Sequence, residues 1–98
     1  MQQFVWDDAN RKHLSRHGVS ISEAEQALNN DPIDVCVQSD EVDGERFQQL
    51  GETNVGRILL IVSTWRGDAT RVITGWEAPK AFKDFYLANK ARNVWKSD

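Results

Sequence analysis

Two histidines near the start of the chain have a spacing that suits chemistry. His13 and His17 are four positions apart, so both rings share one face if this segment is helical. The pair offers two ligands to zinc, which would need a third ligand from elsewhere in the chain. It also offers proton transfer, because histidine changes its charge near neutral pH. An ordinary pair of surface histidines is the plainest alternative, and zinc is the least favoured.

Arginines are the second group of residues that could take part in chemistry, and the ones considered come from the second half of the chain. The side chain presents a planar fork of N–H donors that fits a phosphate and keeps its charge at any useful pH. A solvated sheet face on which each arginine is paired with a nearby acid is the structural alternative. The four arginines are Arg46, Arg57, Arg66 and Arg71.

These residue types suit the cleavage of RNA by its own 2′-hydroxyl. That reaction needs removal of a proton from the hydroxyl, donation of a proton to the 5′ leaving oxygen, and positive groups that stabilise the extra negative charge on the phosphate. The substrate supplies the nucleophile, so we expect no metal and no other cofactor. Glycine-rich phosphate loops, paired CxxC motifs and HExxH motifs are missing from the sequence, which agrees with this expectation.

The order of sequence signals predicts a single α+β domain over residues 1–98. Asp7 precedes a first helix that ends at Gly18, and Ser20 with Glu23 forms a capping box for the second helix. The helices are expected to pack on one face of an antiparallel meander of three or four strands. The expected elements are a strand at 4–6, helices at 8–17 and 20–29, strands at 33–38, 46–51, 58–65 and 69–76, and a helix from residue 79.

Side-chain faces follow from the expected periods of these elements. Strict alternation along residues 69–76 would place Arg71 with Ile73, and Trp76 on the opposite face. Trp65 is expected in the core or at its edge, whereas Trp76 either packs beneath the last helix or stacks on a base. The expected apolar stripe of the last helix comprises Ala78, Phe82, Phe85 and Tyr86, with Val94 and Trp95 as an extension.

Composition limits the classes of protein to which the chain can belong. It is 40% hydrophobic, has one cysteine and contains no apolar run long enough to cross a membrane, so we expect a cytoplasmic protein. Residues 1–45 carry a net charge of −7 and residues 46–96 a net charge of +5. A sequence pI near 5.3 argues against broad nucleic-acid binding but allows a local basic surface.

Several segments, taken in order, resemble the BrnT toxins. They are Phe4-Val5-Trp6-Asp7, Asn10-x-x-His13-x-x-x-His17-Gly18-Val19, Glu45-Arg46-Phe47, Gly56-Arg57-Ile58-Leu59 and Arg71-Val72-Ile73-Thr74. The resemblance implies a RelE-like fold and a metal-independent ribonuclease that halts translation. It also implies an antitoxin partner of the ribbon-helix-helix type. Carried over to this chain, it implies catalytic roles for Arg46, Arg57, Arg71 and His17, with His13 as a weaker candidate.

The chain departs from the family pattern at one position. Trp76 occupies the place of an arginine that many relatives have, and Lys80 and Lys83 are the nearest cations that follow it. We therefore include Trp76, Lys80, Lys83 and His13 as candidates for RNA binding. The departure also leaves an alternative function open, namely a catalytically weak or inactive binding module that acts through a protein partner.

Overall fold

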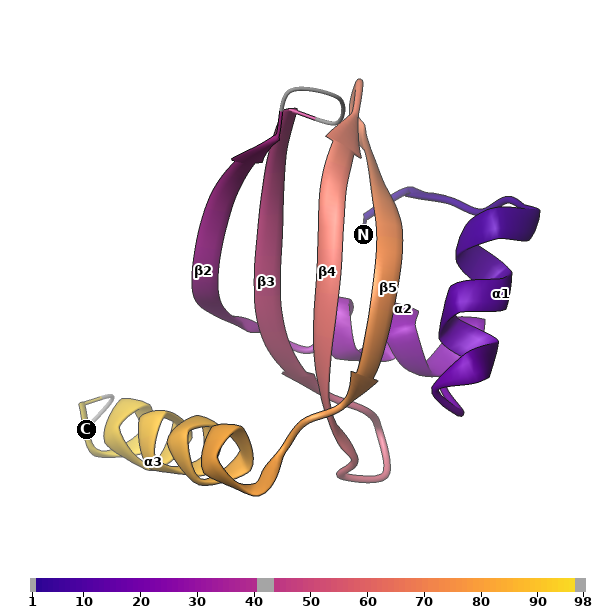
Figure 1. Ribbon diagram of the computed structural model, residues 1–98. Helices are drawn as coiled ribbons and strands as arrows, with labels where there is room; N and C mark the ends of the chain where they lie inside the picture. Colours follow the sequence, from indigo (N-terminus) through magenta and orange to yellow (C-terminus); the bar gives the residue numbers. More distant parts are fainter. Residues whose placement is uncertain (1, 41–43, 97–98) are drawn as a thin grey trace.

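The computed structural model describes residues 2–40 and 44–96, with side chains up to residue 91 apart from that of Asp40. It confirms the α+β order, with a five-stranded sheet in the order β1-β5-β4-β3-β2 (Figure 1). Strands β2 to β5 form the expected antiparallel meander, and β1 adds a parallel strand beside β5. The elements are β1 (Phe4–Val5), α1 (Asp8–Arg16), α2 (Ile21–Asn29), β2 (Ile33–Asp40), β3 (Gly44–Glu52), β4 (Ile58–Arg66), β5 (Ala69–Glu77) and α3 (Lys80–Lys96).

Local hydrogen bonds set the ends of the first two helices where the sequence predicts them. The Asp7 carboxylate accepts the backbone N–H of Asn10, and the Ser20 hydroxyl accepts that of Glu23. In each case the second side chain accepts the backbone N–H of the first, which completes a capping box. Gly18 follows α1 with φ of 69°, a left-handed conformation that glycine adopts at little cost.

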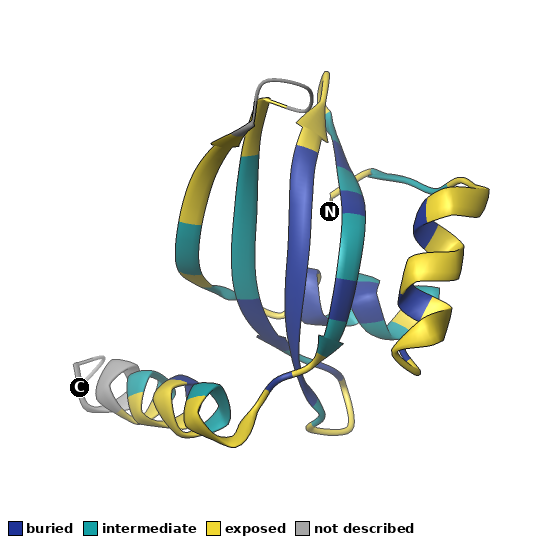
Figure 2. Cartoon of the chain, viewed as in Figure 1, coloured by how far each residue is buried: buried dark blue, intermediate teal, exposed yellow. Residues whose placement is uncertain are grey.

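The helices cover both faces of the sheet, and the expectation that all of them pack on one face is wrong. Figure 2 shows buried residues along the centre of the sheet and on the inner sides of the helices. The prediction failed because the apolar stripe in the sequence of α3 indicates one buried side of the helix but does not indicate which sheet face that side packs against. One core joins α1 and α2 to the sheet through Leu14, Val19, Ala24, Ala27, Leu28, Leu59, Ile61 and Val72. The other joins α3 to the opposite face through Leu50, Ile58, Leu60, Ala78 and Tyr86.

Tyr86 is the main anchor of α3, and the apolar stripe predicted for this helix is only partly correct. Tyr86 is buried and Phe82 packs beside it, whereas Phe85 is 47% exposed. Burial, together with the nearby Glu52 carboxylate, raises the pKa of Tyr86 to about 12. The phenol therefore stays neutral and donates to Glu52 at 3.4 Å. The predictions for the side chains of Val94 and Trp95 lie outside the described residues.

A bulge in β5 changes the side-chain faces predicted from strict alternation. Val62 pairs with Thr74 but Ser63 pairs with Val72, so Ile73 is an extra residue opposite β4. As a result, Val72 enters the core beneath α1, while Arg71 lies on the same sheet face as Trp76. The expectation that Arg71 and Trp76 lie on opposite faces is therefore wrong. Trp65 also differs from expectation, because it is 54% exposed.

Asn10 connects α1, β1 and the bulged part of β5. It is 1% exposed, and its amide nitrogen donates to the carbonyl oxygens of Val5 and Val72, both at 2.9 Å. Because the carbonyl of Val72 precedes the extra residue, Asn10 pairs a polar group that lies next to the bulge.

Asn10→Ala should lower the free energy of unfolding by about 2–4 kcal/mol, because it leaves buried carbonyl groups without a donor. Urea unfolding of the purified protein measures this change. Asn29→Ala is the control, because Asn29 is an exposed residue at the end of α2. An Asn10→Ala protein as stable as the control would contradict the structural role given to Asn10.

Candidate nucleic-acid interface

Two of the predicted arginines lie on one sheet face with a single residue between them. Arg46 of β3 pairs with Thr64 of β4, and Thr64 pairs with Arg71 of β5. Directly paired residues share a face, and two strand spacings separate the arginine backbones by about 10 Å. Both side chains are half-buried, on the face that α3 covers only near the other end of the strands. We call Arg46 and Arg71 the arginine pair.

Arg71 also has an acidic neighbour. Its Nη2 donates to the Asp7 carboxylate at 2.9 Å, which connects β5 to the start of α1. The backbone N–H of Asn10, followed by Arg71, holds the pKa of Asp7 below its usual value. A guanidinium carries five N–H donors, so the bond to Asp7 leaves further donors for a phosphate oxygen.

Helix α1 brings both histidines to the flank nearest β5. The ring of His17 lies 5.7 Å from that of Trp76, measured between centroids. His13 is one turn earlier and shares this flank, whereas Arg11 lines the hollow between α1 and α2. Asn10 binds the carbonyl of Val72, which is next to Arg71 in β5. Because His13 is nearer than His17 to Asn10 along α1, it also lies nearer to Arg71. Both histidines are exposed.

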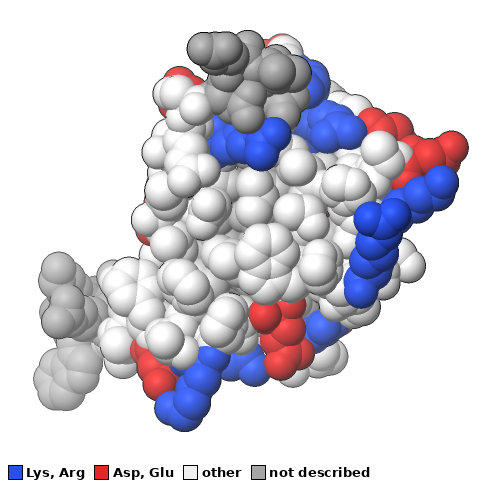
Figure 3. All heavy atoms as spheres, in the orientation of Figure 1, with Lys and Arg blue, Asp and Glu red and all other residues white. Residues whose placement is uncertain are grey.

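Cations of α1 were missed by reasoning from the sequence, because the first half of the chain is net negative. Arg11, Lys12 and Arg16 are the three Lys and Arg residues among residues 1–45, and all three lie in this helix. In Figure 3, basic atoms gather near the upper edge of the sheet and over α1, around a large uncharged area. Counting Lys and Arg by helix turn, rather than by half of the chain, would have found this group.

Arg57 lies apart from the arginine pair, next to the opposite end of β4. Seven positions separate it from Thr64, which is about 20 Å along an extended strand. Its guanidinium donates to the carboxylates of Glu23 at 2.9 Å and Glu77 at 3.1 Å, and to the carbonyl oxygen of Gly18 at 3.0 Å. Arg57 therefore joins the start of α2 to the end of β5.

The lysines predicted to bind RNA lie near Arg57 and are also paired with acids. Lys83 contacts Glu77 at 2.8 Å, and Lys80 contacts Asp84 at 2.8 Å. Lys83, followed by Arg57, lowers the pKa of Glu77. The structure thus brings Arg46 and Arg71 together, places His13, His17 and Trp76 along the neighbouring edge, and leaves Arg57, Lys80 and Lys83 in a separate charged group.

Two kinds of feature are absent from the part of the chain that the structure describes. Residues 2–40 and 44–96 contain no group of three or more His, Cys, Asp or Glu side chains placed to hold a metal ion. No helix in those residues is long and apolar enough to span a bilayer.

Arg57→Gln should lower the free energy of unfolding by about 1–2 kcal/mol at pH 7, because it removes hydrogen bonds from two carboxylates. The pKa of Glu23 is lowered by the backbone N–H of Ser20 and then by Arg57. A carboxyl group whose pKa is lowered by folding stabilises the fold at pH values above its ordinary pKa. This stabilisation is lost as the pH falls through the pKa that the group has in the folded protein. The difference between wild type and variant should therefore shrink below about pH 4.

Chemical denaturation at several pH values measures this difference. Lys80→Gln is the control, because the Lys80 side chain is 88% exposed and its removal should leave stability unchanged. A difference between wild type and Arg57→Gln that stays constant from pH 7 to about pH 3 would contradict the role of the carboxylates.

A family model described as the ribonuclease toxin BrnT of type II toxin–antitoxin systems matches residues 6–81. No curated protein matches the chain. The matched region includes α1, α2, all of β2 to β5, the arginine pair, Arg57 and Lys80, but not Lys83, and it exceeds half of the chain. Membership of this family implies an RNA substrate and an antitoxin protein as partner. The chain belongs to the BrnT family of ribonuclease toxins of type II toxin–antitoxin systems.

Proposed function

We propose that this protein is a metal-independent ribonuclease that acts in the cytoplasm, cuts mRNA and thereby inhibits translation until a ribbon-helix-helix antitoxin neutralises it. The observation that carries the proposal is the position of Arg46 and Arg71 on one sheet face, on either side of Thr64 and away from the end of the strands where α3 packs. Two guanidinium groups at this separation can contact the same phosphate from two sides, because each side chain is long.

The arginine pair would stabilise the negative charge that builds up on the phosphorus as the 2′-hydroxyl attacks. Rigid neighbouring strands hold both guanidinium groups before the substrate binds, which makes such stabilisation effective. The bond from Asp7 to Arg71 fixes the direction of that side chain and leaves other N–H donors for the phosphate.

Proton transfer is assigned to His13, although the resemblance points first to His17. Along α1, His13 is six residues from Asp7, which is about 9 Å in a helix, and Asp7 touches Arg71. The side chains of His13 and Arg71 can therefore approach one nucleotide. His17 is four residues farther, beside Trp76, and serves RNA binding instead.

The bound strand would run along β5 from the arginine pair towards Trp76. Arg71 and Trp76 are five residues apart along β5, which is about 15 Å, and two or three nucleotides span this distance. Trp76 packs partly against the core on the α3 side, as one of the two expectations had it, and an unstacked base would stack on the exposed part of its ring, which His17 borders. Exposed cations on α1 add sequence-independent attraction for the phosphates.

A second function is favoured by one specific observation. The carboxylate of Asp7 already engages Arg71. The resemblance also implies that Trp76 stands where many relatives have an arginine. A chain with fewer cations available for the phosphate would still bind its protein partner but would not cleave RNA. It would then be a binding module with the toxin fold. The two functions differ in whether purified protein cuts RNA.

Arg46→Gln and Arg71→Gln should each lower kcat for RNA cleavage by about 100-fold or more, because each removes a preorganised charge from the transition state. The assay follows a labelled single-stranded RNA with EDTA present. Lys90→Gln is the matched control, because Lys90 contacts Asp31 and Tyr86 in another part of the molecule. Wild-type protein that does not cut RNA, or variants that cut at the control rate, would favour the binding module.

His13→Gln should lower kcat and flatten its pH dependence between about pH 5 and 8, where histidine changes its charge. His17→Gln should mainly raise KM, because it removes a contact next to Trp76. Steady-state kinetics over this pH range separates the two effects. The reverse result, with kcat sensitive to His17 and insensitive to His13, would move the proton transfer to the C-terminal end of α1.

A further inference from the structure

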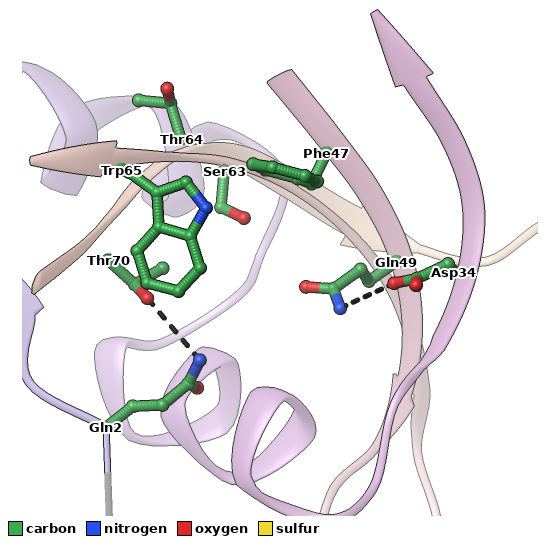
Figure 4. Close-up of a pocket in the computed structure, with 8 residues that line it drawn as sticks. All are labelled: Gln2, Asp34, Phe47, Gln49, Ser63, Thr64, Trp65 and Thr70. Carbon is green, nitrogen blue, oxygen red and sulfur yellow. Dashed lines mark hydrogen bonds between the residues drawn. The ribbon is translucent and has the colours of Figure 1, made fainter. Parts of the chain in front are cut away.

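An aromatic hollow lies on the sheet face opposite the arginine pair. It has a volume of about 200 Å³ and is lined mainly by Phe47, Trp65, Gln49, Asp34, Thr70 and Gln2. Figure 4 shows Trp65, Thr70 and Gln2 on one side of the open space, and Phe47, Gln49 and Asp34 on the other. Hydrogen bonds within each side, from Gln49 to Asp34 at 2.9 Å and from Gln2 to Thr70 at 3.4 Å, hold these polar groups in place.

The strand register places this aromatic hollow on the same face as α1 and α2. Phe47 pairs with Ser63, which shares the face of Leu59 and Ile61 in the core beneath these helices. Trp65 continues that row on β4 beyond Ser63. The helices cover the sheet beside Leu59 and Ile61 but leave the row near Trp65 exposed to solvent.

Two large apolar side chains are exposed to solvent at this part of the sheet. Trp65 is 54% exposed and Val37 is 53% exposed, and Val37 pairs directly with Phe47. The ring of Phe47 meets that of Trp65 edge-on, with 6.2 Å between the centroids. Contiguous apolar residues at the surface mark interaction sites, and tryptophan is enriched among the residues that dominate binding energy.

The charge of the hollow favours a protein over RNA as its occupant. Among the described residues, its lining contains the carboxylate of Asp34 and no lysine or arginine. RNA affinity depends on cations that neutralise phosphates, so this surface lacks the main source of such affinity. A polypeptide with an apolar side chain and a nearby basic group matches both the aromatic walls and Asp34.

The neighbouring strand edge also fits a polypeptide. Among the described residues, β2 is the terminal strand of the sheet, with β3 on one side and no strand on the other. The outer backbone groups of such a strand can pair with an added extended segment. Val37 lies on this strand next to the hollow, so alternate side chains of an added segment would lie over the same apolar surface.

We propose that the aromatic hollow and the outer edge of β2 form the docking site of the antitoxin. An extended antitoxin segment pairs with β2 and places an apolar side chain between Phe47 and Trp65, with a basic residue facing Asp34. The inference rests on the antitoxin partner that family membership implies, and it does not depend on the cleavage chemistry. Antitoxin binding and the arginine pair then lie on opposite faces of the sheet, so single substitutions separate them.

The test compares Trp65→Ala with Phe85→Ala, a matched control that removes an exposed aromatic ring from α3. The probe is the protein encoded next to this chain's gene, purified from co-expression and titrated by calorimetry. Trp65→Ala should weaken binding by about 30-fold or more and leave RNA cleavage unchanged, while the control binds as wild type. Binding of Trp65→Ala at wild-type affinity overturns the proposal.

Two further readouts make the result specific. Hydrogen exchange at the backbone amides of residues 36–39 should slow in the complex, and unchanged exchange would overturn the pairing with β2. Loss of RNA cleavage by Trp65→Ala with intact antitoxin binding would also overturn the proposal and assign the hollow to RNA. If the wild-type protein does not cut RNA, the proposed ribonuclease fails, but the binding comparison still decides the docking site.

Discussion

One extra residue in β5 decides which side chains share a face of this sheet. Ile73 has no direct partner on β4, so the alternation of side chains changes phase between Val72 and Thr74. Val72 thereby reaches the core, and Arg71 reaches the face that it shares with Arg46 and Trp76. A regular strand that kept Val72 in the core would place Trp76 on the side of α1 and separate it from Arg71. The candidate site therefore depends on this bulge.

Helix α1 stabilises the bulged segment and presents the histidines next to it. Asn10 binds the carbonyl of Val72 from within the helix, and Asp7, the N-cap of the same helix, binds Arg71. The first turn of α1 is thus fixed to β5 at two points, which sets the rotation of the helix about its axis. That rotation brings His17 to Trp76 and, one turn earlier, places His13 on the same flank. The chemistry of the interface follows from how the helix starts.

Features that depend on a few neighbouring residues were predictable from the sequence. Asp7, Gly18 and the Ser20–Glu23 pair act through bonds to nearby backbone atoms, so residue type and spacing suffice to identify them. The sheet face of Arg71 was not predictable, because nothing in the run from Ala69 to Glu77 marks the extra residue. For Arg57, pairing with an acid was one of the two alternatives that the sequence left open, but its partner Glu23 was not predictable, since it comes from α2, distant in sequence.

A local basic region can form on an acidic protein when its charges are unevenly neutralised. Near the end of β5, Arg57 and Lys83 are balanced by Glu23 and Glu77, which leaves little net field for a phosphate. At the other end, Asp7 is the acidic partner of Arg71 among the described residues, and the neighbouring helix α1 adds cations. Since salt limits electrostatic attraction to about 8–10 Å, local balance matters more than the total of −3. The aromatic hollow, whose described lining has an acid and no cation, lies across the sheet from this basic region and suits a different class of partner.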